Sequence, residues 1–326
     1  MSRQRILYVS LKYDYAEPQR GPSYEALNLE HGMCECASEG MFDLSIFHID
    51  DMRITLGQEE ADIALTNRIN EFNPTIIFHT SFDDNWDINP GTLLWTQKKG
   101  IKNILYNQDA SWRFNDFILP RKDRYTYFIT THNMTVPWFH ENNMKVIKSQ
   151  WGGSSLYTKQ AEKQYQYDVS FVGQRHGIRP QMINALNQAG IKVHLFGQYW
   201  KGHPDDHGFV PFDEMIDVFN NSKINLNFSN PFHIGTTPQI KGRHFEIPQC
   251  GGFHITTPAD DLESYFVSNR EVIIVDNMLD MVNKIRYYLE NDSEREAIAT
   301  AGYNRMLEEH TWKKRFINIL KEIEDV

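Results

Sequence analysis

The chain has 326 residues, with 33 Lys and Arg against 43 Asp and Glu, and its formal net charge is −10. A single hydrophobic core seldom grows beyond ~250–300 residues, so this length predicts two domains. A hydrophobic content of 40% excludes a disordered chain, and the acidic balance argues against a domain that holds nucleic acid by bulk charge.

In the first half, apolar runs of strand length alternate with amphipathic segments of helix length, which predicts parallel β-α-β units. The predicted strands are residues 5–10, 43–49, 75–80, 102–107, 127–130 and 145–149. The predicted helices between them are residues 23–38, 59–72 and 90–99.

The same alternation starts again in the second half. Its predicted strands are residues 168–172, 192–196, 224–228, 253–256 and 272–275. Its predicted helices are residues 181–189, 212–222, 243–249, 278–291, 293–309 and 312–323, and Ser293 with Glu296 has the spacing of a capping box at the start of one of them.

A segment rich in Gly and Ser, residues 149–157, separates the two halves and is typical of a linker. We therefore predict two doubly wound, Rossmann-like α/β domains, 1–155 and 156–326, that face each other across a cleft. In such sheets ligands bind beyond the carboxyl ends of the strands, so functional residues are sought in the loops that follow strands.

The sequence also bears on the compartment. No stretch approaches the ~18 apolar residues of a membrane span, and the apolar run near the start is too short for a signal peptide. Three cysteines do not suggest a disulfide framework. The expected location is the cytoplasm; the oligomeric state stays open.

The candidate residues of the first half follow predicted strands. Tyr13 lies in a polar and aromatic loop after the first strand, and an ordinary solvated loop is the alternative interpretation. His79, Asp109 and His132 each stand at or just beyond a strand end, where we expect them to face an acceptor. A carboxylate such as Asp109 can accept the proton of an acceptor hydroxyl, although a residue at this position can equally cap the next helix.

The second half begins with a predicted buried strand that ends in Gly173, followed by Gln174 and Arg175. A glycine at this turn lets the backbone approach a phosphate closely, and an arginine supplies two parallel donors to phosphate oxygens. This pattern is weak by itself. It indicates a phosphate site here because it follows the first strand of the second Rossmann-like unit.

A second candidate for donor binding surrounds the helix predicted over residues 243–249. Lys241, Gly242 and Arg243 stand at its start, where free N–H groups and the helix dipole favour an anion such as a diphosphate. Glu246 follows three residues after Arg243 and can accept hydrogen bonds from the vicinal hydroxyls of a ribose. The alternative is a helix with an incidental basic start.

A metal site is not predicted. His203 and His207 have the spacing of a zinc pair on a helix, but the surrounding Pro and Gly residues are incompatible with a helix.

Residues 167–312 resemble the C-terminal domain of the glycosyltransferases grouped with the spore-maturation protein CgeB, a branch of the GT-B superfamily. The strongest matching motif is Arg243-His-Phe-Glu-Ile-Pro-Gln-Cys-Gly-Gly-Phe253. Other matching elements, in order, are Tyr167-Asp-Val-Ser-Phe-Val-Gly173, Ser222-Lys-Ile-Asn-Leu-Asn-Phe228, Asp261-Leu-Glu-Ser-Tyr-Phe266 and His310-Thr-Trp312.

This resemblance implies a metal-independent glycosyltransferase that uses a nucleotide-diphosphate sugar as donor and needs no other cofactor. It also implies that the last helix, residues 312–323, packs back toward the first domain. It implies phosphate contacts for Arg175 and Arg243, which with Asp109 are the predicted catalytic residues. Related retaining enzymes carry a Glu-x7-Glu motif; Glu246 matches its second glutamate, whereas Pro238 occupies the first position. The analogy favours retention of configuration.

Two other functions stay open from the sequence. The missing first glutamate at Pro238 would suit a GT-B module that binds a nucleotide sugar without transferring it. A nicotinamide oxidoreductase is disfavoured, because no strand is followed by Gly-x-Gly-x-x-Gly. The acceptor is open among glycan precursors, proteins, metabolites and modified DNA bases. A DNA acceptor would need a local basic face, for instance one made by Lys98, Lys99, Lys102, Arg121, Lys122 and Arg124.

Overall fold

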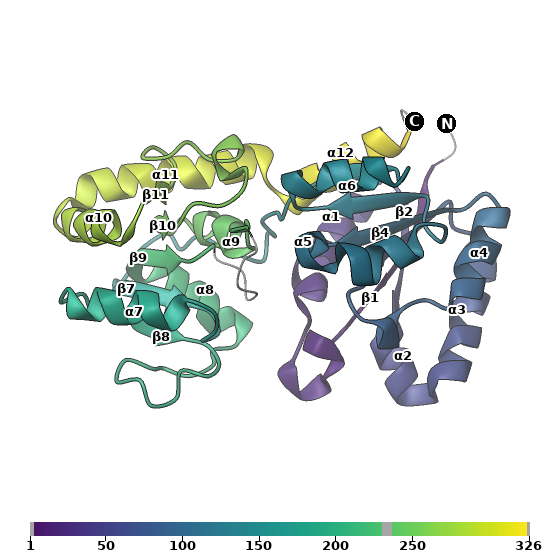
Figure 1. Ribbon diagram of the computed structural model, residues 1–326, viewed down its shortest axis with the longest axis horizontal. Coiled ribbons are helices and arrows are strands. Elements are labelled where there is room, and N and C mark those ends of the chain that lie inside the picture. Colours follow the sequence, from purple (N-terminus) through teal and green to yellow (C-terminus); the bar gives the residue numbers. More distant parts are fainter. Residues whose placement is uncertain (1–2, 230–236, 325–326) are drawn as a thin grey trace. The chain divides into compact units, whose positions relative to one another are not determined.

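The computed structural model describes residues 3–229 and 237–324. The chain divides into two compact units, Met1–Gln150 together with Trp312–Val326, and Trp151–Thr311 (Figure 1). The predicted boundary lay after residue 155, whereas the first unit here ends at Gln150, and the last helix is counted with the first unit.

The first unit contains a parallel sheet of six strands in the order β2-β1-β3-β4-β5-β6. The strands are β1 (Arg5–Ser10), β2 (Asp43–His48), β3 (Ile76–Thr80), β4 (Lys102–Asn107), β5 (Tyr127–Thr130) and β6 (Val146–Lys148). Its inner strands are buried on both faces, which explains why they are continuous apolar runs rather than alternating ones.

The main helices of the first unit are α1 (His31–Ser38), α2 (Ile49–Leu56), α3 (Gln58–Phe72), α4 (Pro90–Lys98), α5 (Ala110–Arg113), α6 (Val136–Glu141) and α12 (Trp312–Glu324). The sequence analysis missed α2, which begins directly after β2 without an intervening turn. A π-helical turn, η3 (Ala26–Glu30), opens the segment that was predicted as one helix over residues 23–38.

The last helix, α12, packs onto the first unit through two aromatic residues. Trp312 is fully buried and lies edge-on to Tyr106, while Phe316 lies edge-on to Phe78 of β3. A Cβ atom on Gly32 of α1 would lie 2.5 Å from that of Trp312, so α1 and α12 approach each other too closely for a side chain there.

The second unit contains a parallel sheet of five strands in the order β11-β10-β9-β7-β8. The strands are β7 (Tyr167–Val172), β8 (His194–Phe196), β9 (Ser222–Asn227), β10 (His254–Thr256) and β11 (Ile273–Ile274). The helices are α7 (Arg179–Gln188), α8 (Phe212–Asn220), α9 (Arg243–Gln249), α10 (Met278–Glu290) and α11 (Asp292–Glu309).

Two details of the helix ends can be compared with the sequence. The capping box at Ser293 is not formed, because α11 already begins at Asp292 with Asn291 at its N-cap. Helix α9 ends in a glycine turn, in which Gly251 follows the C-cap Cys250 with a φ of +66°.

Both units are doubly wound parallel α/β folds, as predicted. In each, the strand order reverses beside the first strand, between β1 and β3 in the first unit and between β7 and β9 in the second. The loops after these four strands are therefore where ligands are expected. None of the helices in the described part of the chain is both long and apolar enough to cross a bilayer.

Candidate functional site

The loop after β7 begins with a tightly packed glycine. The Gly173 carbonyl accepts a hydrogen bond from Trp200 Nε1 at 2.8 Å, and its N–H donates to the Phe196 carbonyl at 2.8 Å. A Cβ on Gly173 would lie 2.9 Å from the ring of Phe171. The predicted need for glycine at this turn is real, and its cause in this structure is packing against the protein itself.

Arg179, the first residue of α7, is a candidate site residue that was not predicted from the sequence. Its Nη1 donates to the Gln174 carbonyl at 2.9 Å, while its Nε is buried and bonds to no residue within 3–229 or 237–324. Burial, and after it the positive charge of Arg243, lowers the pKa of Arg179 to about 10. Two guanidinium groups held near each other stabilise an anion placed beside both.

His176 lies in the same group of side chains. Burial, followed by the positive charges of Arg179 and Lys241, lowers the pKa of His176 to about 4. The imidazole is therefore neutral at pH 7, and the positive charge of this group belongs to the arginines and the lysine.

The segment before α9 is held by His244. The Lys241 N–H donates to His244 Nδ1 at 2.9 Å, and the His244 N–H donates to the Lys241 carbonyl at 3.0 Å. The Lys241 amide is thus already used, so it is not one of the free donors that the sequence predicted at this helix start. The Lys241 ammonium contacts Gln239 Oε1 at 2.6 Å, and the Gly242 carbonyl accepts the N–H groups of Phe245 and Glu246.

Arg243 and Glu246 form an ion pair along α9. One carboxylate oxygen, Oε2, accepts from Arg243 Nη1, and Arg243 Nε donates to the Val172 carbonyl at 3.3 Å. The Glu246 side chain has no exposed surface, and its other oxygen, Oε1, has no partner in the part of the chain that the structure describes. A buried carboxylate oxygen without a donor is well suited to accept hydrogen bonds from a ligand.

The other residues predicted to bind the donor lie in the same loops. Arg175 is exposed, and its backbone N–H donates to the Gln198 carbonyl at 3.0 Å. The side chain of Gln174 contacts Gln198 Oε1 at 3.4 Å. Arg179 is therefore a further candidate beside Arg175, because the charge of Arg243 acts on it. Its only sequence signal was a Pro at the next position, which is typical of a helix start.

In the first unit, Tyr13 and the loop after β1 are anchored by two carboxylates of α2. Asp50 accepts from the backbone N–H groups of Lys12 and Tyr13 at 2.8 and 3.0 Å, and Asp51 accepts from the Tyr13 hydroxyl at 3.1 Å. The Tyr13 hydroxyl thus has a structural partner and fixes the course of the loop.

His79 and His132 are buried, contrary to the expectation that they face an acceptor. His79 has no exposed surface; its Nδ1 lies 2.7 Å from the Tyr125 hydroxyl and 3.6 Å from Asp87. Burial lowers the pKa of His79 to about 4. His79 lies within β3 rather than beyond it, so its side chain joins the core; His132 is 3% exposed.

Asp109 lies at the N-cap position of α5, but its side chain makes no capping hydrogen bond. The backbone N–H of Asp109 donates to Asn107 Oδ1 at 2.9 Å. This local hydrogen bond uses the backbone and not the carboxylate. The adjacent Gln108 reaches Glu25 Oε1 at 3.5 Å. Burial, and after it the negative charges of Asp14 and Asp109, raises the pKa of Glu25 to about 7. Glu25 is thus a second candidate site residue that was not predicted from the sequence.

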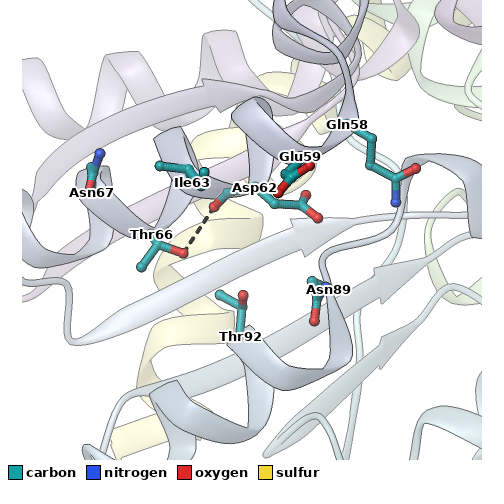
Figure 2. A pocket seen from close by; sticks show the side chains of 8 residues that line it. All are labelled: Gln58, Glu59, Asp62, Ile63, Thr66, Asn67, Asn89 and Thr92. Carbon is teal, nitrogen blue, oxygen red and sulfur yellow. Dashed lines mark hydrogen bonds between the residues drawn. The ribbon is translucent and has the colours of Figure 1, made fainter.

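A wide depression of about 610 Å³ lies elsewhere on the first unit, between α3 and the start of α4 (Figure 2). It is lined mostly by polar residues together with Ile63. Asp62 within it pairs with Arg53 at 2.9 Å, while the Asp62 carbonyl accepts from Thr66. It lies on the helices and not at the carboxyl edge of the sheet, and it brings together none of the predicted site residues.

The histidines considered for a metal have other partners. His207 Nε2 lies 2.8 Å from His194 Nδ1, and His203 Nε2 lies 3.2 Å from Asn187 Nδ2. Within residues 3–229 and 237–324, no three His, Cys, Asp or Glu side chains are grouped as a metal site.

Comparison with known proteins gives one family match. Residues 175–321, just under half of the chain, match the family model described as "Glycosyl transferase-like". This range includes Arg179, Lys241, Arg243 and Glu246. A comparison with curated protein sequences finds no match.

Several solved structures share the whole architecture. A glycosyltransferase from Rickettsia africae has a TM-score of 0.65 at 12% identity over 100% of this chain and 99% of its own. Anabaena HepE in complex with UDP-glucose has a TM-score of 0.64 at 10% identity over 99% and 100%. An alpha-glucosyltransferase in complex with UDP and a mismatched 13-mer DNA has a TM-score of 0.70 at 11% identity over 98% and 100%. The chain therefore has the α/β GT-B fold of glycosyltransferases, with a glycosyl transferase-like match over most of its second unit.

Proposed function

We propose that this protein transfers a sugar from a nucleotide-diphosphate sugar to a hydroxyl acceptor without a resident metal ion. The observation that carries the proposal is the group formed by Arg179, Lys241 and Arg243 beside the buried Glu246. Arg179 has no carboxylate partner among the residues described, and it lies close enough to Arg243 for that charge to lower its pKa. The family match and the UDP complexes of similar structures support the same chemistry.

The reaction explains why cations are needed at this place. When the bond between the anomeric carbon and the diphosphate oxygen breaks, the sugar becomes oxocarbenium-like and negative charge accumulates on the diphosphate. Cations aimed at that charge stabilise the transition state more than the ground state. We assign this role to Arg179 and Arg243, with Lys241 in support, and we assign the ribose hydroxyls to Oε1 of Glu246.

We further propose that the anomeric configuration is retained, on the analogy with related retaining GT-B enzymes. Asp109 then positions the acceptor hydroxyl and need not act as a base. With inversion, Asp109 would be the base that takes the proton of that hydroxyl. The proton NMR spectrum of the first product distinguishes the two outcomes through the configuration of the new glycosidic bond.

The donor site is tested by titrating UDP into the wild type, Arg179→Gln and the matched control Arg175→Gln in a calorimeter. A charge-assisted hydrogen bond contributes ~1.5–3 kcal/mol, so we expect Arg179→Gln to bind UDP roughly ten- to a hundred-fold more weakly. Arg175→Gln should bind within a few-fold of the wild type. Equal affinity of the wild type and Arg179→Gln would refute this placement of the diphosphate.

A module that binds nucleotide sugars without transferring them is the second candidate, because Pro238 stands where related enzymes carry the first glutamate of the motif. Release of UDP from UDP-sugars, followed in the presence and absence of EDTA and across several acceptors, separates the two. Turnover that survives EDTA supports a metal-independent transferase. UDP binding with no donor consumption for any acceptor supports the module.

A further inference from the structure

The carboxyl edge of the first sheet carries aromatic rings and carboxylates that the donor chemistry does not use. The loops after β1 and β3 meet there, at the point where the strand order reverses: the ring of Tyr15 lies edge-on to that of Phe82, with 6.3 Å between centroids. Tyr15 is 58% exposed although its ring contacts the ring of Phe82.

The neighbouring side chains and the backbone conformation together position Tyr15. Asp14 forms an ion pair with Arg20 at 2.8 Å, and the Arg20 guanidinium lies 4.5 Å from the centre of the Tyr15 ring. Tyr15 and Ala16 both have positive φ values, 53° and 58°, a conformation that ordinary side chains rarely adopt. This uncommon conformation, beside the Asp14–Arg20 ion pair, leaves the Tyr15 ring facing solvent.

Carboxylates and an amide lie beside these rings. Ser23 Oγ donates to the Leu11 carbonyl at 2.6 Å and accepts the N–H of Ala26, which places Glu25 in the first turn after the loop. Glu25 reaches Gln108 at the end of β4, and its charge, like that of Asp109, acts on the Tyr15 hydroxyl. Ser81, between β3 and Phe82, has a buried hydroxyl without a partner in the described parts of the chain.

The basic residues considered for a DNA acceptor lie elsewhere. Lys102 opens β4 at the amino edge of the sheet, opposite to Asp109, and its ammonium donates to the Ile323 carbonyl at 3.0 Å. Arg121 is 3% exposed and pairs with Asp84 and Asp87. Lys102 and Arg121 thus have partners within the first unit, and a polyanion placed at the carboxyl edge would meet the carboxyl groups of Glu25 and Asp109.

From this arrangement we infer that Tyr15, Phe82, Glu25 and Asp109 form the acceptor site, and that the acceptor is an uncharged carbohydrate. Rigid aromatic rings provide an apolar surface for the C–H faces of a sugar, while carboxylates accept hydrogen bonds from its hydroxyls. That the bound sugar is an acceptor rests on the proposed function, but the binding of a sugar at this edge can be measured without any transfer.

The test uses the full chain on an array of uncharged oligosaccharides, with a 13-base-pair DNA duplex as the anionic probe, in saturating UDP and at physiological salt. We expect the wild type to bind at least one oligosaccharide, and Glu25→Gln and Tyr15→Ala each to lower that affinity at least about ten-fold. Asp123→Asn, an exposed carboxylate before β5, is the matched control and should leave it unchanged.

Three results would overturn the inference: no oligosaccharide bound, tighter binding of the duplex than of any oligosaccharide, or equal binding by the wild type, Glu25→Gln and Tyr15→Ala. UDP titration of the same variants is the separate check on the proposed function. Oligosaccharide binding without UDP binding would support the carbohydrate site and refute the proposed transferase function. UDP binding without oligosaccharide binding would support the donor site and refute the acceptor assignment.

Discussion

The two units share the order of their first five strands, but the functional candidates at the carboxyl edges of their sheets carry opposite charge. At the edge of the second sheet the functional candidates are Arg179, Lys241 and Arg243, while at the edge of the first they are Glu25 and Asp109. The polar groups therefore come from the loops, and the sheets only set where those loops meet. The same scaffold thus suits a diphosphate in one unit and an uncharged ligand in the other, in line with the rule that function belongs to sites and not to folds.

The largest effect on stability that tests this comparison should come from the ion pair of the second unit. Arg243→Ala leaves the fully buried Glu246 without its cation, and such a loss costs roughly 3–5 kcal/mol of the free energy of unfolding. Urea unfolding measures it, with the exposed Arg175→Ala as control. Adding Glu246→Gln to Arg243→Ala should recover much of the loss. If Arg243→Ala is as stable as Arg175→Ala, the pair does not stabilise the unit.

The next effect concerns a property that both units share, a buried neutral histidine. Burial lowers the pKa of His244 to about 4, against an ordinary value of 6.5. The unfolded chain then binds more protons between these values, so stability falls as the pH drops from 6.5 to 4, by roughly 3 kcal/mol for this residue.

The measurement is the free energy of unfolding at pH 7 and at pH 4.5, for the wild type and His244→Gln. The variant should lose less stability on acidification than the wild type, whereas the exposed His140→Gln should show the same loss as the wild type. His79, whose pKa is also about 4, predicts the same behaviour for the first unit. An unchanged pH dependence in His244→Gln would contradict the prediction.

A smaller effect of opposite sign is expected at the acidic edge of the first unit. The pKa of Glu25 is raised to about 7, chiefly by burial, so the folded state holds this proton more tightly than the unfolded chain does. Its contribution to stability therefore falls as the pH rises from 4.5 to 7. Because the side chain keeps some contact with water, we expect a shift on the order of 2 kcal/mol.

Glu25→Gln should accordingly be more stable than the wild type at pH 8 and nearly equal to it at pH 4.5, as measured by urea unfolding at both values. Asp123→Asn serves as the control at the opposite edge. A Glu25→Gln protein that is less stable than the wild type at pH 8 would show that the carboxylate is favourably solvated or paired there, and would weaken the charge contrast between the units.

The smallest effect should be equal in the two units, because it depends on local helix chemistry alone. Asn89 accepts the N–H of Gly91 at the start of α4, and Asn277 accepts the N–H of Asp280 at the start of α10. Replacing either N-cap with Ala should cost about 1 kcal/mol. Thermal unfolding of Asn89→Ala and Asn277→Ala measures both, and a large difference between them would mean that one cap also has a tertiary role.

The sequence alone was sufficient for most of the fold. The bounds of β1, β4, β5 and α9 agree with the prediction to the residue, since apolar periodicity and turn residues act over short distances. It also selected the loops that carry the proposed donor site, through Gly173 and the segment around Arg243 and Glu246. The start of α11 lies one residue before the predicted start, and helix α2 was not predicted, because a cap or a turn signal is a weak local preference that packing can override.

Only the tertiary structure decided which side chains in those loops can meet a ligand. Arg175 and Arg179 both follow the same strand, and the sequence does not distinguish them. In the structure Arg175 is exposed, whereas Arg179 is partly buried beside Arg243. His79 and Glu25 show the reverse choice: the first joins the core of its sheet, and the second lies with Asp109 at the edge. Burial and neighbouring charge arise from contacts between residues far apart in the chain, so local sequence determined the elements, and long-range packing determined their chemistry.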